Sequence, residues 1–368
     1  MKNEGDLALL YGYLHGAVGA ASTCCWLGVW HAGWLRHPAL AALGSAGTMA
    51  ATVWVGQAVV TQRVTDDQSR LAKLFQSETW VSYDSAYYWP ADLEPLVQHL
   101  PQEPTEEEIR QELTTLRSAG FSAIYLHESR AALRDVPRLA REAGFRGVVM
   151  AIRIGDPKRL SSREVLDQID AAASASRWVD AYCFGELTAR EVDLGELKRS
   201  LATIRLKTKR PVTTSFLDDE YFGRREAALR ELADFTIRGL HHQWDTQPSV
   251  ADAIERVERA YESFQQDEAP GLLTFVGFPS AGSHEWSDAS QADFFRAVKG
   301  KLRAPLGTNC VYYTSFDLPW SRRYGEVNQG RGHEGRFGLF ATEVQDNKRE
   351  LSFRAKPSIR EIFNKAGK

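Results

Sequence analysis

The chain has 368 residues, enough for one large domain and an accessory segment. Its formal net charge of -3 and sequence pI near 6.3 provide no basic surface, so no nucleic-acid partner is expected. The four cysteines show neither zinc-site spacing nor a disulfide framework, and there is no metal or nucleotide motif, so no cofactor is expected; they are Cys24, Cys25, Cys183 and Cys310.

The first 64 residues differ from the rest of the chain. Residues 7–35 and 38–62 contain no Asp, Glu, Lys or Arg. Because about 20 apolar residues span a bilayer, each run is long enough for a transmembrane helix, and residues 1–64 are predicted to form a membrane hairpin. A buried soluble hairpin is the alternative, whereas a cleaved signal peptide is shorter and not repeated.

The charges around this hairpin favour one orientation. Arg36 lies in the turn between the runs, which favours a cytoplasmic turn and places the rest of the chain on the periplasmic or extracellular side of the cytoplasmic membrane. Arg63, Arg70 and Lys73 follow the second run and argue for the opposite orientation.

Residues 65–78 are polar and predict a helical connector to a domain over residues 79–368. In that domain, short apolar runs alternate with segments of helical period, and the predicted strands lie in 79–84, 121–127, 147–154, 179–187, 211–217, 235–244, 272–278 and 310–320. The predicted helices between them lie in 104–120, 135–144, 161–176, 193–208, 224–234, 249–264 and 287–302, and 358–363 is a candidate eighth helix.

Eight strand–helix units in this length predict a (β/α)8 TIM barrel. A doubly wound open sheet is the competing fold, but no glycine-rich phosphate loop follows the first strand. In a barrel, functional side chains lie where strands end, and these ends are rich in carboxylates and aromatic rings. Such a mouth suits a carbohydrate. The candidate binding residues are Tyr83, His127, His241, Trp244, Phe278 and Trp320.

Several of these strand ends resemble glycoside hydrolase family 17, the β-1,3-glucanase family, over about residues 79–345. "VDAYCFGELTARE" is similar to the segment that ends in Gly-Asn-Glu, "LHHQWD" to a His-x-x-Trp loop, and "GFPSAG" to Gly-Trp-Pro-Ser-x-Gly. "PTEEEIRQELTTLRSAGFSAIYLH" and "SFDLPW" resemble the family's second and last strands. The resemblance implies that Glu186 occupies the position of the general acid/base.

The same resemblance places Phe275 where the family has its nucleophilic glutamate. Gly185 replaces the asparagine before the acid/base, and Phe216 stands in "TTSF" where an acid is usual. Strand two reads "IYLH" instead of Ile-Arg-x-Tyr, and the last strand has Leu318 and Ser321 instead of a charged pair. Because a retaining glycosidase needs two carboxylates, these changes predict a catalytically degenerate barrel, a pseudoenzyme.

Three functions follow from this comparison. The first is a membrane-anchored β-glucan-binding or -guiding accessory component of polysaccharide synthesis or export, with a membrane glycosyltransferase or export complex as partner. The second is an active β-1,3-glucan hydrolase or transglycosylase, with Glu186 as acid/base and Glu285 or Asp317 as a relocated second carboxylate. The third is a structural platform that contacts a membrane partner.

Overall fold

The computed structural model describes residues 66–88, 103–129, 131–154, 162–186, 192–217, 224–240, 248–264, 270–301, 308–319, 321, 333, 335–344, 351–356 and 359. The chain divides into two compact units, Met1–Ser69 and Arg70–Lys368. Each helix in the described ranges is too short or too polar to cross a membrane. The predicted membrane hairpin of residues 1–64 lies outside the described residues and stays a prediction.

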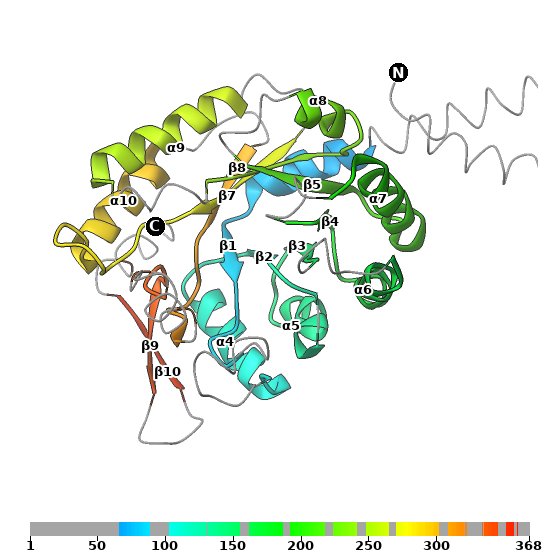
Figure 1. Ribbon diagram of the computed structural model, residues 1–368. Helices are drawn as coiled ribbons and strands as arrows, with labels where there is room; N and C mark the ends of the chain where they lie inside the picture. Colours follow the sequence, from blue (N-terminus) through cyan, green and yellow to red (C-terminus); the bar gives the residue numbers. More distant parts are fainter. Residues whose placement is uncertain are drawn as a thin grey trace, which may run out of the picture. The chain divides into compact units, whose positions relative to one another are not determined.

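Eight parallel strands close into a barrel within the described part of the chain (Figure 1). Each strand pairs with the next along the chain, and β1 also pairs with β8, so the barrel leaves no open edge. The strands are β1 (Trp80–Tyr83), β2 (Ala123–Leu126), β3 (Gly147–Ile152), β4 (Ala181–Phe184), β5 (Val212–Leu217), β6 (Thr236–Gly239), β7 (Gly271–Val276) and β8 (Thr308–Tyr312). This closure confirms the predicted (β/α)8 fold and excludes the open sheet.

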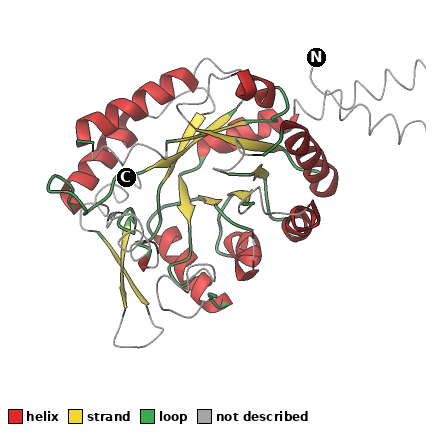
Figure 2. Cartoon of the chain, in the orientation of Figure 1, coloured by secondary structure: helices red, strands yellow, loops and turns green. Residues whose placement is uncertain are grey.

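Helices surround the strands (Figure 2). They are α4 (Glu106–Ser118), the 3-10 helix η2 (Ala131–Asp135), α5 (Val136–Glu142), α6 (Ser162–Ser174), α7 (Leu194–Thr208), α8 (Arg224–Arg230), α9 (Val250–Phe264) and α10 (Asp288–Lys301). Helix α4 begins where the Pro-Thr-acid pattern predicts, because the Thr105 hydroxyl accepts from the backbone N–H of Glu108, whose side chain accepts from the backbone N–H of Thr105.

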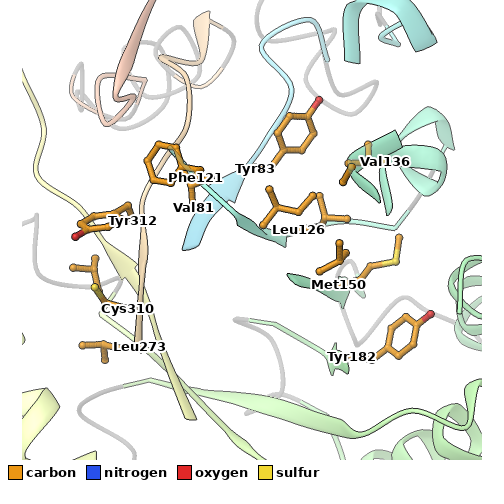
Figure 3. Close-up of a cluster of buried hydrophobic side chains, with 14 of the residues drawn as sticks. Val81, Tyr83, Phe121, Leu126, Val136, Met150, Tyr182, Leu273, Cys310 and Tyr312 are labelled. Carbon is orange, nitrogen blue, oxygen red and sulfur yellow. The ribbon is translucent and has the colours of Figure 1, made fainter. Parts of the chain in front are cut away.

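Alternate residues of each strand face opposite sides of the barrel wall. One set packs against the helices and includes Val81, Tyr83, Leu126 and Met150 (Figure 3). The other set fills the barrel interior with residues such as Trp80, Tyr125, Ala151 and Cys183. The position of a residue in this alternation therefore decides whether its side chain faces the helices or the interior and mouth of the barrel.

The predicted connector is helical over residues 66–77, and Leu71, Leu74 and Phe75 of this helix belong to the interior packing. Leu71 and Phe75 are fully buried. The Phe75 ring centroid lies 5.6 Å from that of Trp80 at the start of β1 and 5.7 Å from that of Phe235 just before β6. The helix thus closes the amino-terminal end of the barrel and leaves the carboxyl ends of the strands for a site.

An antiparallel hairpin, β9 (Phe340–Val344) and β10 (Leu351–Ala355), follows the barrel and was not predicted. Figure 1 shows its strands extending beside the barrel near β1 and α4. A buried ion pair fixes its end, because Lys356 Nζ lies 3.0 Å from Asp317 Oδ1 and donates to Ser280 at 2.8 Å. The pair ties the residue after β10 to the loops that follow β7 and β8.

Candidate functional site at the carboxyl end of the barrel

Glu186 lies at the carboxyl end of β4, one residue beyond a glycine that turns the chain. Gly185 has a φ of 71°, a left-handed conformation that glycine adopts without a steric penalty. The Glu186 side chain is 3% exposed. The carboxylate is therefore held inside the mouth instead of extending into solvent.

Two side chains from the second strand and its end hold the Glu186 carboxylate. The Tyr125 hydroxyl donates to Oε1 at 2.5 Å, and Nδ1 of His127 lies 2.7 Å from Oε2. Tyr125 and His127 are two residues apart, so they project from the same side of the barrel wall. Both carboxylate oxygens consequently have a partner within the protein.

The His127 ring also contacts the first strand. Its Nε2 forms a hydrogen bond with the Ser82 hydroxyl and lies 4.0 Å from Oδ2 of Asp84. Burial lowers the pKa of His127, but the nearby carboxylates of Glu186 and Asp84 outweigh it, so that the pKa is raised overall. The raised pKa favours the imidazolium form, which donates from both ring nitrogens.

Phe275 covers one face of this imidazole. The two ring centroids are 5.0 Å apart with 31° between the planes, and the Phe275 ring also lies 5.1 Å from that of Tyr313. Phe275 has a φ of 59°, and the pairing of β7 with β8 shifts register between Leu273 and Val276. This irregularity turns Phe275 toward the interior, although Leu273, two residues earlier, packs against the helices.

The backbone of β6 leaves space for the same ring. A Cβ added to Gly239 would lie 3.2 Å from Cδ2 of Phe275. Gly239 therefore allows the phenyl ring to pack closely against the barrel wall. Phe275 is 4% exposed, so its ring fills space at the inner end of the mouth.

Asp84 forms the solvent-facing part of this network. Its side chain is 23% exposed, compared with 10% for His127. Burial is the largest cause of the raised pKa of Asp84; His127 and Arg153 lower that pKa, whereas Glu186 and Glu128 raise it. Arg153, just beyond β3, is exposed.

Several sequence-predicted site residues lie in other surroundings. Tyr83 points toward the helix layer, where its hydroxyl bonds to Glu112 of α4 (Figure 3). Phe278 is fully buried and stacks on Phe294 of α10, with ring centroids 5.6 Å apart, so neither of these candidates presents an open ring face. Phe216 also packs in the helix-facing core and does not fill the mouth.

The two candidate replacement carboxylates have different environments. Asp317 pairs with Lys356 and accepts from the Gly338 N–H at 2.9 Å. Glu285 is 54% exposed and lies 3.6 Å from His284. Their roles stay predictions, as do those of His241, Trp244 and Trp320, which lie outside the described residues.

Ser82 was missed as a site residue. Asp84 ends the first predicted strand, at the expected mouth of the barrel, but was not among the candidate binding residues. Alternation along β1 places both on the interior side, with Trp80, and this was the available signal. In the parts of the chain that the structure describes, no three His, Cys, Asp or Glu side chains are grouped to hold a metal ion. The described mouth thus offers hydrogen-bonding groups, charge and aromatic rings.

Comparison with protein-family profiles gives no match, and comparison with curated proteins gives none either. Solved structures do show the same architecture. GH5_18 from Streptomyces cattleya in complex with GlcNAc has a TM-score of 0.53 at 13% identity, covering 78% of this chain and 79% of that chain. Beta-glycosidase BGL167 has a TM-score of 0.51 at 14% identity, covering 79% and 96%.

A beta-glucuronidase from Faecalibacterium prausnitzii has a TM-score of 0.54 at 12% identity, covering 73% of this chain and 47% of that chain. At such low identities the likeness concerns the fold alone. Membership of glycoside hydrolase family 17 and the replacement of a nucleophile by Phe275 therefore stay hypotheses. The chain therefore shares the (β/α)8 barrel fold of these solved structures.

Proposed function

We propose that this protein is a membrane-anchored, glycosidase-like barrel that binds or guides a β-glucan or a related polysaccharide without hydrolysing it. In this role it is an accessory component of polysaccharide synthesis or export. The observation that carries the proposal is that the Phe275 ring packs on the His127 ring, and Nδ1 of the same His127 contacts Glu186. The position that the resemblance assigns to a nucleophile thus holds a hydrocarbon ring.

Hydrolysis with retention requires a second carboxylate about 5–5.5 Å from the acid/base, placed to attack the anomeric carbon. A phenyl ring cannot form that bond or offset the positive charge of the transition state. The Glu186 oxygens are also engaged by Tyr125 and His127, which orient the carboxylate toward the protein. These two features support loss of turnover.

Binding of a sugar needs neither a nucleophile nor a free acid/base. Sugar rings pack their C–H faces on aromatic side chains, and their hydroxyls bond to polar groups at the rim of a site. Tyr313 is partly exposed beside Phe275 and supplies an aromatic surface. Trp244 and Trp320 remain the candidate platforms from the loops.

The direct test compares binding with turnover on laminari-oligosaccharides. Calorimetry on the detergent-purified full chain should show binding, while a reducing-sugar assay should show no new chain ends. Trp244→Ala or Trp320→Ala should weaken binding, and Glu186→Gln should change it little. Absence of binding to these oligosaccharides and to related polysaccharides would contradict the proposal.

Phe275→Glu provides a second test of degeneracy. It restores a carboxylate, but Gly185 still lacks the amide side chain at the preceding position, and Tyr125 and His127 still hold Glu186. The variant should therefore remain without substantial glucanase activity. Full glucanase activity in this single variant would show that the rest of the site is intact.

Membrane anchoring is supported by the two uncharged runs in residues 7–35 and 38–62. Detergent, but not salt, should release the full chain from membranes. A reporter fused after Lys73 should behave as periplasmic or extracellular. Release by salt alone would contradict the anchor, whereas a cytoplasmic reporter would contradict only the orientation.

An active β-glucan hydrolase or transglycosylase is the second candidate, with Glu186 as acid/base. Asp84 favours it, because this carboxylate lies near His127 Nε2 while Glu186 contacts Nδ1. Inverting enzymes use carboxylates about 6.5–9.5 Å apart, with water between one of them and the sugar. Robust turnover that Glu186→Gln abolishes would favour this function over the binding role.

A further inference from the structure

The carboxylate of Asp84 differs from that of Glu186 in its bonding. Its contact with His127 Nε2 is 4.0 Å, too long for a hydrogen bond, whereas Glu186 has two close partners. Among the described residues, no side chain or backbone group forms a hydrogen bond with the Asp84 carboxylate. Because the group is buried on three-quarters of its surface, it lacks most of the water that satisfies an exposed carboxylate.

The position of Asp84 makes it accessible to a ligand. Ser82 projects from β1 into the barrel and bonds to His127, and Asp84 lies two residues later, on the same side and nearer the solvent. Tyr313, the residue after β8, borders the same imidazole with ring centroids 5.9 Å apart, and it is partly exposed. An acceptor and an aromatic ring therefore flank the buried imidazole of His127.

We propose that Asp84 binds a sugar of the polysaccharide by accepting hydrogen bonds from a pair of neighbouring hydroxyls, while Tyr313 contacts the C–H face of the same ring. An ionised carboxylate is an acceptor with two oxygens, and vicinal hydroxyls present two donors at matching spacing. This inference rests on the proposed glycan-binding function and assigns it a residue and a ligand group.

The surrounding charges favour a neutral sugar. Asp84 already lies within electrostatic range of two cationic groups, His127 and Arg153, and of two acids, Glu186 and Glu128. A charged sugar would meet a group of its own sign in either case. A neutral hydroxyl pair gains charge-assisted hydrogen bonds without that repulsion.

The experiment measures binding of laminari-oligosaccharides by calorimetry to the wild-type full chain, Asp84→Asn, Asp84→Ala and the control Asp167→Asn. Asp167 is exposed on α6, so its substitution makes the same charge change away from the mouth. Asp84→Asn keeps the shape but replaces one acceptor with a donor. It should weaken binding about tenfold or more, while Asp167→Asn should leave the affinity unchanged.

Analogues that lack one hydroxyl identify the partner group. The analogue missing the correct hydroxyl should bind the wild type about tenfold more weakly but bind Asp84→Asn with little further loss, since the contact is already broken. Wild-type affinity in Asp84→Asn, or losses that simply add for every analogue, would overturn the role of Asp84 and leave glycan binding intact. Absence of binding to the wild type would overturn both proposals. If the Asp84 variants fail to fold, equal affinity of the wild type for every analogue would overturn the inference.

Discussion

Nδ1 of His127 lies 2.7 Å from Oε2 of Glu186, and the opposite ring nitrogen contacts Ser82. One imidazole thus joins the ends of β1, β2 and β4 beneath the mouth of the barrel. In a buried pair of this kind, the protonation state of the imidazole decides whether the carboxylate has a cationic partner. The first prediction concerns the stability that this contact provides.

His127→Gln should destabilise the fold more at acid than at alkaline pH. The folded pKa of His127 is raised above its usual 6.5, so its contribution is fully present below about 6.5 and is lost as the pH rises through the folded value. Urea unfolding of wild type and variant at about pH 5.5 and about pH 9 measures this difference, with roughly 1.4 kcal/mol per unit of pKa shift. A pH-independent difference would indicate a neutral imidazole.

Phe275 permits an unusual comparison of glycine with alanine. Phe275→Ala should cost about 3–5 kcal/mol because it removes a buried ring. Phe275→Gly should lower the free energy of unfolding by roughly 1 kcal/mol less than Phe275→Ala does. The reason is that a φ of 59° is strained for alanine but open to glycine. Urea midpoints and slopes measure both. A glycine variant clearly less stable than the alanine variant would contradict the left-handed conformation.

Glu112 should make stability fall as pH rises. Burial is the main cause that raises the pKa of Glu112 from 4.5 to about 8, despite hydrogen bonds from Tyr83 and the Ala86 N–H. Between those pH values the folded state holds a proton that the unfolded state has lost. The free energy of unfolding therefore falls by roughly 1.4 kcal/mol for each unit that the pH rises.

Glu112→Gln should remove this slope while keeping an acceptor for the Ala86 N–H. Glu107→Gln, an exposed change on the same helix, provides the control. The measurement is the free energy of unfolding of all three proteins between about pH 5 and pH 8. An unchanged slope in Glu112→Gln would assign the pH dependence to other groups.

Lys356 and Asp317 should be strongly coupled. Lys356→Met leaves the Asp317 carboxylate buried without its cation and should cost about 3–5 kcal/mol. The double variant Lys356→Met/Asp317→Asn should recover part of this loss, because it removes the unpaired charge. Unfolding of the two single variants and the double variant gives the coupling energy. Additive losses would contradict a direct ion pair.

The sequence by itself determined the barrel. Eight apolar runs that alternate with amphipathic segments are local patterns, and each one predicts a strand or a helix from its own residues alone. The closed order β1 to β8 then follows from parallel strands joined by short crossovers. The same patterns placed Glu186 just beyond β4, where the structure has it. They did not predict the hairpin β9–β10, which follows the eight repeated units.

Only the tertiary structure decided how the site is assembled. Tyr125 and His127 meet Glu186 across 61 and 59 residues of sequence, and closure of the barrel brings them together. Alternation along β1 points Tyr83 toward the helices. The same alternation along β7 would point Phe275 toward the helices, as it does Leu273. A register shift and a left-handed backbone turn Phe275 inward instead. Local sequence preferences oppose that conformation for a phenylalanine, so it depends on the surrounding packing.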